Sequence, residues 1–132
     1  MAAVMARVIR DGAGEMSLVR VAQDGTVRQP VPIDAAFTPA VAAGDRLGPV
    51  ALSSTGEQEL RLTAFGWDGS ARWRRLVGRA LAAGSWLRLS AIAVDPVHGV
   101  RVTGTFSGSV EIAGQVLDSG GKTAVFLVAL ER

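Results

Sequence analysis

The sequence predicts an all-β, antiparallel fold, and three observations support this prediction. Apolar and polar residues alternate with a period of two over residues 100–106, as in a half-buried strand. Asp24-Gly25 and Asp68-Gly69 each separate two runs of strand-forming residues, a pattern typical of β-hairpins. Residues 124–130 form an apolar run, rich in strand formers, that is shorter than most helices.

The first hairpin is predicted around Asp24-Gly25, between residues 16–21 and 26–31. Pro30 lies inside the second run and limits it to an edge strand, because proline cannot donate to a strand ladder. Residues 34–48 carry little strand pattern. We expect them to form a long loop or an eroded strand pair.

Residues 60–65 and 71–77 form the second predicted hairpin. Its second run has an alternative, because residues 71–83 also show helical spacing, with apolar residues on one face and arginines on the other. Such a basic amphipathic helix would lie on anionic membranes or acidic partners. In a strand, Trp73 would be a core residue and the arginines would be solvated. The sequence leaves both alternatives open.

In the C-terminal third, a short strand at residues 92–94 is expected to end at Asp95-Pro96. Residues 100–106 then form a strand, Ser107-Gly108 a turn, and residues 110–112 the returning strand. Further along the chain, residues 118–121 are predicted to form a loop. The apolar run at 124–130 that follows is expected to be a fully buried strand.

One segment resembles a known family. Residues 99–114 read Gly-Val-Arg-Val-Thr-Gly-Thr-Phe-Ser-Gly-Ser-Val-Glu-Ile-Ala-Gly. They resemble the β-propeller repeats of bacterial surface and secreted proteins, whose units run roughly Gly-x-Val-x-Val-Thr-Gly-x-Phe-Ser-Gly-x-Val-x-Phe-Gly. A weak internal repeat of glycine-containing loop and strand accompanies this resemblance. The length of 132 residues predicts one domain, 1–132. The resemblance implies a degenerate repeat unit over 11–59 and a well-kept unit over 60–132.

The resemblance implies antiparallel propeller-blade-like repeats, about two per chain, whereas closed propellers need about four to eight blades. Homo-oligomeric closure, or collapse into a small β-barrel or sandwich, would cover the exposed edges, and a third alternative is that the chain is a piece of a longer repeat protein. We therefore expect a non-enzymatic structural or interaction module that self-associates through its strand edges into a closed homo-oligomer or a larger assembly. The residues expected to carry this self-association are Phe106, Val125 and Leu127.

A lectin-like or anion-binding module is the alternative. Positive charge is concentrated over residues 72–88, and all three tryptophans lie within residues 67–86. Indole rings beside carboxylates and guanidinium groups suit sugars or anionic surfaces, and Trp67 is the tryptophan expected to be exposed. The candidate partner-binding residues are Trp67, Asp68, Arg72, Trp73, Arg74, Arg75, Arg79, Trp86 and Arg88.

Composition argues against several other classes of function. The chain has no cysteine and a single histidine, His98, so thiolate sites and sites with two histidine ligands are ruled out. No metal, cofactor or catalytic group is predicted. The net charge of +2 does not suggest nucleic-acid binding. No transmembrane segment is predicted. The resemblance implies an extracellular or cell-surface location, but no signal peptide is visible, which leaves a cytoplasmic location open.

Overall fold

The structure, a computed structural model, describes residues 2–10, 13–33, 37–46, 48–95, 97 and 99–131. In these ranges the chain forms ten strands and no helix, and every strand pairing is antiparallel, which confirms the predicted all-β antiparallel fold. The strands are β1 (Ala2–Arg10), β2 (Ala13–Val21), β3 (Val31–Ile33), β4 (Phe37–Asp45), β5 (Gly48–Thr55), β6 (Glu59–Phe65), β7 (Ala71–Ala80), β8 (Trp86–Asp95), β9 (Gly99–Ile112) and β10 (Gln115–Leu130).

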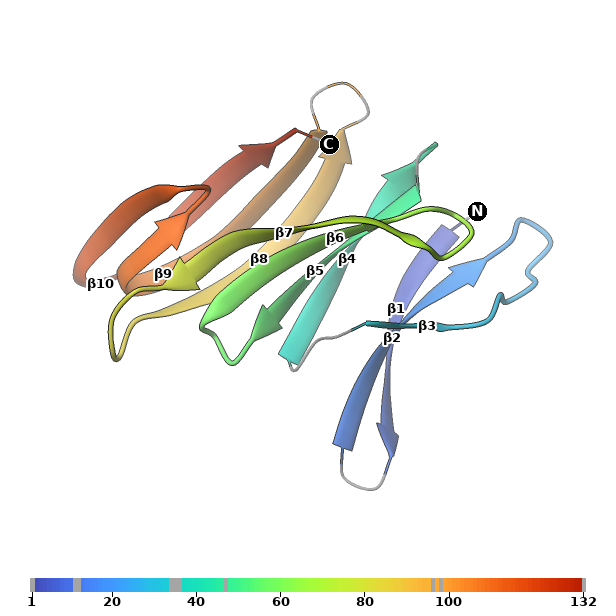
Figure 1. The fold of residues 1–132 in the computed structure, drawn as a ribbon, viewed down its shortest axis with the longest axis horizontal. Coiled ribbons are helices and arrows are strands. Elements are labelled where there is room, and N and C mark those ends of the chain that lie inside the picture. Colours follow the sequence, from blue (N-terminus) through green and yellow to red (C-terminus); the bar gives the residue numbers. More distant parts are fainter. Residues whose placement is uncertain are drawn as a thin grey trace.

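The strands form two sheets, a small one of order β1-β2-β3 and a seven-stranded one in which six strands follow the order β10-β9-β7-β6-β5-β4 and the seventh, β8, pairs with β9 (Figure 1). In the larger sheet, β9 joins two layers, because its first half pairs with β8 and its last residues pair with β7. At the other end of the sheet, β4 lies against β8. The sheet is therefore a nearly closed barrel, which is the small-barrel alternative of the prediction.

The core lies inside this barrel. Alternation in β9 follows the predicted pattern, since Val100, Val102 and Phe106 are buried whereas Arg101 is exposed. Phe106 packs beside Phe126 of β10, with 6.5 Å between the ring centroids. The buried core cluster consists of Val50, Leu52, Leu60, Leu62, Ala64, Val77, Leu87, Val100, Val102, Phe106, Val110, Ile112 and Phe126.

Both predicted Asp-Gly turns are present. The Asp24 carboxylate accepts a hydrogen bond from the Thr26 N–H at 2.9 Å, and the Asp68 carboxylate accepts one from the Ser70 N–H at 3.0 Å. β6 and β7 pair across the second turn, so the strand alternative for this segment is confirmed and the helix alternative is wrong. After the first turn, the regular strand is β3, which starts beyond Pro30 and is shorter than predicted.

The loop alternative for residues 34–48 is wrong. Residues 34–36 and 47 lie outside the described residues, but β4 occupies most of the segment and pairs with β5. The segment is rich in alanine and small residues, which give little contrast between the two faces of a strand. The boundary between the two predicted repeat units falls after Glu59, the first residue of β6, and six residue pairs join β5 and β6, from Val50↔Ala64 to Thr55↔Glu59.

The turn predicted at Ser107-Gly108 is also wrong, because β9 continues to Ile112. Gly108 has φ +85, and a Cβ there would lie 2.3 Å from the Ser85 Oγ, so this glycine makes room for a neighbouring strand connection. The true turn is Ala113-Gly114, with φ of 50 and 79, the two positive values that a tight hairpin turn requires.

Two predictions for β10 need correction. The loop predicted at residues 118–121 is an irregularity within one long strand, because pairing with β9 shifts register between Asp118 and Thr123. The last run is not fully buried, since Val125 and Leu127 are 75% and 71% exposed. Alternate residues of this run do face the core, namely Ala124, Phe126, Val128 and Leu130, so burial within the chain leaves only its outward apolar residues unexplained.

Candidate functional site

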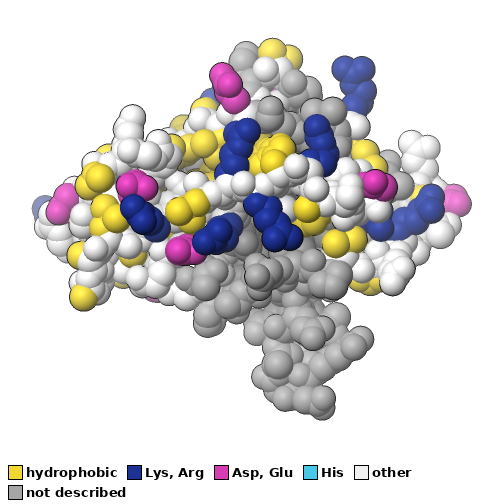
Figure 2. All heavy atoms as spheres, viewed as in Figure 1, with side chains coloured by type: hydrophobic (Ala, Val, Ile, Leu, Met, Phe, Trp, Pro, Cys, Tyr) yellow, Lys and Arg dark blue, Asp and Glu magenta, His cyan; other side chains and the backbone are white. Residues whose placement is uncertain are grey.

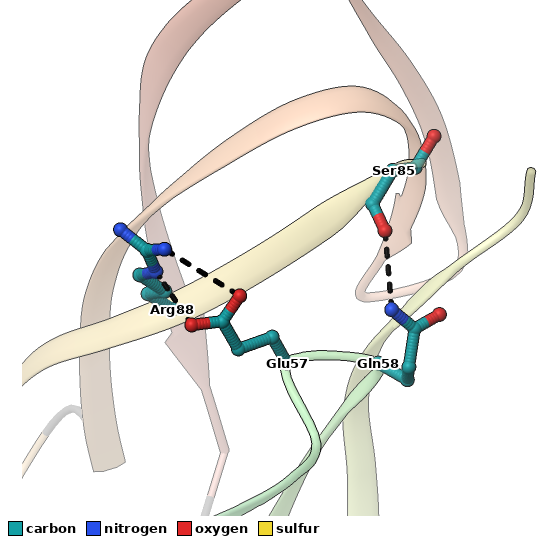
Figure 3. Close-up of polar contacts among 4 residues, drawn as sticks. All are labelled: Glu57, Gln58, Ser85 and Arg88. Carbon is teal, nitrogen blue, oxygen red and sulfur yellow. Dashed lines mark hydrogen bonds and ion pairs between the residues drawn. The ribbon is translucent and has the colours of Figure 1, made fainter. Parts of the chain in front are cut away.

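Arg88, one of the predicted partner-binding residues, holds two parts of the barrel together. Its guanidinium forms an ion pair with Glu57 of the β5–β6 turn at 2.8 Å (Figure 3). The neighbouring Gln58 side chain donates a hydrogen bond to the Ser85 carbonyl at 3.2 Å. Arg88 also lies over the Trp86 ring, 4.4 Å from its centroid. These contacts assign Arg88 and Trp86 a role within the chain.

Two further arginines of the predicted cluster also make contacts within the chain. Arg79 pairs with Glu111 of β9 at 3.4 Å. Arg75 lies 4.5 Å from the centroid of the Trp73 ring and donates a hydrogen bond to the Glu131 carbonyl. Because these guanidinium groups bind groups of the chain itself, the positive charge available to an outside anion is smaller than the sequence predicts.

The basic residues do not merge into one patch on the face that Figure 2 shows. Arginine side chains are spread singly across it, with hydrophobic and acidic side chains between them. Arg72 and Arg74 of β7 are both exposed. The alternation of a strand and the presence of paired carboxylates thus disperse a charge that is contiguous in the sequence.

The three tryptophans do not form one platform. Trp67 lies in the β6–β7 turn and is partly buried, although it was expected to be exposed. Trp73 packs against the core and pairs with Ala64, close to the same turn. Trp86 begins β8 and pairs with Ser107, near the other end of β7. Only Trp67 and Trp73 therefore lie at the same end of the barrel.

Trp67 and Asp68 line a pocket between the two sheets, together with Arg20, Arg28 and Gln29. Its volume is ≈ 490 Å³. Sequence reasoning missed Arg20, which lies on β2, far along the chain from the β6–β7 turn. Only the packing of the small sheet against that turn brings them together, and no local sequence pattern records this.

The side chain of Asp68 is fixed within its turn. The Ser70 hydroxyl donates to the Asp68 Oδ1 at 2.7 Å and the Ser70 N–H to the same atom at 3.0 Å. The Ser70 hydroxyl and then its N–H lower the pKa of Asp68 below its usual value of 3.8. The carboxylate is therefore ionised at neutral pH and contributes a negative charge to the pocket.

The predicted self-association residues divide into two groups. Phe106 is only 5% exposed and belongs to the core, so its side chain is not part of the surface. Val125 and Leu127 are exposed on β10, the last strand in the order of the large sheet. Of the strands that the structure describes, only β9 pairs with β10. One long edge of β10 is thus open.

Two other kinds of site receive no support within the described residues. Among them, no group of three or more His, Asp or Glu residues is placed to hold a metal ion, and His98 lies outside them. The described part of the chain also contains no helix that is long and apolar enough to cross a membrane.

Comparisons with protein-family models, curated proteins and solved structures find no match to this chain. The resemblance to propeller repeats therefore stays a prediction. Any function has to be argued from the geometry of the chain itself.

Proposed function

We propose that this chain is a non-enzymatic interaction module that self-associates through the open edge of β10. The observation that carries the proposal is a long unpaired strand edge that bears exposed apolar side chains. Val125 and Leu127 are 75% and 71% exposed. Edge strands offer unpaired N–H and C=O groups to another strand, and proteins usually protect such edges.

The two parts of β10 differ in this protection. A register shift with two consecutive glycines, Gly120 and Gly121, and the charged residues Asp118 and Lys122 lie in its middle. Bulges and charges of this kind discourage pairing with a further strand. The following part, residues 123–130, contains no charged residue. We assign the association to this second part, which is called the β10 edge below.

The surface beside the β10 edge suits a continued sheet. On the outward face, Val125 lies opposite Thr105 and Leu127 opposite Thr103 of β9. Next to Thr103 on β8 is Ala91, which is also exposed. A groove of ≈ 510 Å³ is lined partly by Val125 and Leu127. Side chains of an added strand would therefore meet the uncharged side chains of residues 123–130 first, and the charged residues Arg88 and Arg101 lie one or two strands further in, beside Thr105 and Ala129.

A second copy of the chain is the partner that fits this edge. Antiparallel pairing of one strand with itself is symmetric about a twofold axis, so both copies use the same surface. A register centred on Leu127 would place Leu127 opposite Leu127 of the second copy. Val125 would then lie opposite Ala129 of the second copy. All these side chains are uncharged, so no like charges would face each other.

Pairing through the β10 edge would also limit the size of the assembly. Blade-like repeats would close a ring from several copies, because each copy would offer two complementary edges. A single β10 edge is used up once two copies have paired. We therefore propose a dimer as the closed homo-oligomer, with a sheet that continues through β10 of both copies.

Light scattering coupled to size exclusion, over a range of micromolar protein concentrations, tests the proposal. The wild-type chain is expected to pass from the mass of one copy to that of two as the concentration rises. Leu127→Lys should stay at the mass of one copy, because two lysines would face each other at the twofold axis. Val116→Lys is the matched control. Val116 lies on the same strand before the register shift and is 65% exposed.

The variants separate the possible results. Dissociation by Leu127→Lys but not by Val116→Lys supports pairing through the β10 edge. A wild-type chain with the mass of one copy at every concentration overturns the proposal. So does a dimer that Leu127→Lys leaves intact while circular dichroism shows unchanged strand content. Val97→Lys is a second control, because Val97 is 82% exposed and lies outside β10.

A further inference from the structure

Arg20 is a buried cation where the small sheet meets the barrel. The residue is only 7% exposed. Its Nη1 donates to the Trp67 carbonyl at 2.6 Å and its Nη2 to the Gln29 carbonyl at 3.2 Å. The Nε is buried and has no hydrogen-bond partner. Both acceptors are neutral, and within the described residues no carboxylate forms an ion pair with Arg20. Arg20 therefore has no carboxylate in contact, and the Asp68 carboxylate acts on its charge from a greater distance: after the two hydrogen bonds from Ser70, attraction to Arg20 is a lesser cause that lowers the pKa of Asp68.

A glycine in the barrel permits this placement. The Arg20 guanidinium lies against Gly69 of the β6–β7 turn, where a Cβ would come within 3.0 Å of the Arg20 Cζ and 2.9 Å of Val31. Gly69 also has φ +93, a conformation that other residues rarely adopt. The turn therefore serves two purposes, since it closes the hairpin and admits a cation from the other sheet.

The pocket beside Arg20 has the size of a small-molecule site and a mostly polar lining with one aromatic ring. Its volume of ≈ 490 Å³ falls in the range of ligand pockets. Arg20, Arg28, Gln29, Trp67 and Asp68 line it. Two guanidinium groups and one carboxylate give these side chains a net charge of +1 (2 − 1). A buried cation favours a nearby anion, because an unpaired buried charge is costly.

The other residues that line the pocket indicate which kind of anionic ligand would fit. The carboxylate of Asp68 repels a bare inorganic anion but accepts hydrogen bonds from hydroxyl groups. Both hydrogen bonds from Ser70 reach its Oδ1, so Oδ2 is the atom available to a ligand. Trp67 adds an indole ring, on which the apolar face of a sugar ring can pack. A ligand that combines one anionic group with several hydroxyls and an apolar face would contact the guanidinium groups, the Asp68 carboxylate and the Trp67 ring together.

We propose that this pocket binds an acidic sugar, a pyranose ring that carries a carboxylate. The carboxylate would pair with the guanidinium groups of Arg20 and Arg28, the ring would pack on Trp67, and ring hydroxyls would donate to Asp68. The site is separate from the β10 edge, and it uses Arg20, Arg28 and Gln29, which lie outside the cluster predicted from the sequence.

Isothermal titration calorimetry with a trimer of galacturonic acid, and with its methyl ester, tests the proposal. The acid form is expected to bind. The affinity for the uncharged ester should be lower by about tenfold or more, because a charge-assisted contact contributes about one to two powers of ten in affinity. Arg28→Ala and Trp67→Ala should each weaken binding about tenfold. Arg74→Ala is the matched control, an exposed arginine that does not line the pocket.

Further variants distinguish loss of the site from loss of the fold. Arg28 is exposed, so its loss should leave the melting temperature unchanged, and Trp67→Phe should restore most of the binding lost in Trp67→Ala. Binding should persist in Leu127→Lys, which separates this site from self-association. Equal binding of acid and ester, acetate binding as strong as that of the trimer, no binding of the trimer, or affinity unchanged in both Arg28→Ala and Trp67→Ala overturns the proposal.

Discussion

At Gly104 the β9 backbone passes close to two neighbours. A Cβ there would lie 2.2 Å from the Arg88 carbonyl oxygen and 2.6 Å from the Phe126 ring. Gly104 thus lets the Phe126 ring cover the strand, next to Phe106 two residues later. In the segment that resembles propeller repeats, this glycine therefore has a packing role in this chain.

Gly104→Ala is expected to lower the free energy of unfolding by about 3 kcal/mol, the upper part of the range for overpacked cores, because one obstructing atom belongs to the backbone. Gly120→Ala is the control. No atom lies within 4 Å of a Cβ at Gly120, so only its φ of +64 adds a cost, about 1 kcal/mol. Urea denaturation of both variants measures the difference. Equal losses would contradict the packing role.

The lowered pKa of Asp68 predicts that the stability of the fold depends on pH. Its pKa in the folded chain is below the usual value of 3.8, chiefly because of the Ser70 hydroxyl and N–H. A lowered folded pKa stabilises the fold above the unfolded pKa, and this stabilisation is lost as the pH falls through the folded pKa. Asp68→Asn should therefore lower the melting temperature near neutral pH, and the difference from the wild-type chain should shrink between about pH 5 and about pH 2. A difference that is constant across this range would contradict the assignment.

At the scale of the elements, local signals predicted strands well where one face is buried. The alternation in β9 and the Asp-Gly turns predicted strand type and pairing, because both depend on neighbours in the chain. The prediction of a turn at Ser107-Gly108 failed because Gly108 makes room for Ser85 of the β7–β8 connection, a tertiary contact that the sequence does not record. The local signal consists of two small residues between apolar runs. The same signal occurs in a turn and in a strand that packs closely against another segment.

In the candidate sites, too, local properties were predicted from the sequence and tertiary contacts were not. Val125 and Leu127 were predicted as contact residues from their apolar run, and the structure places both on an open edge. Phe106 was grouped with them, because a sequence shows that a residue is apolar and not which face of the sheet it occupies. The arginines of residues 72–88 gave a charge signal, but their carboxylate partners lie elsewhere in the sequence, Glu57 in the β5–β6 turn and Glu111 on β9.

For the whole molecule, barrel closure leaves β10 with one open edge among the strands that the structure describes. β9 pairs with β8 and β7 on one side and with β10 on the other, while β4 packs back against β8. β10 is thus held outside the closed part of the sheet, with its second half uncharged. The small sheet contributes Arg20 to the pocket at the β6–β7 turn, where it meets the barrel. The fold therefore presents two separate surfaces, one for a second copy and one for a small anion.

Amide hydrogen exchange, measured by mass spectrometry at low and high protein concentration, tests the central claim most directly. About half of the amides in an edge strand point away from its one neighbour and exchange readily unless a second strand binds them. Exchange over residues 123–130 should slow as the concentration of the wild-type chain rises, and should not change with concentration in Leu127→Lys. Exchange in this segment that is independent of concentration, or slowing that appears only in other strands, would contradict association through the β10 edge.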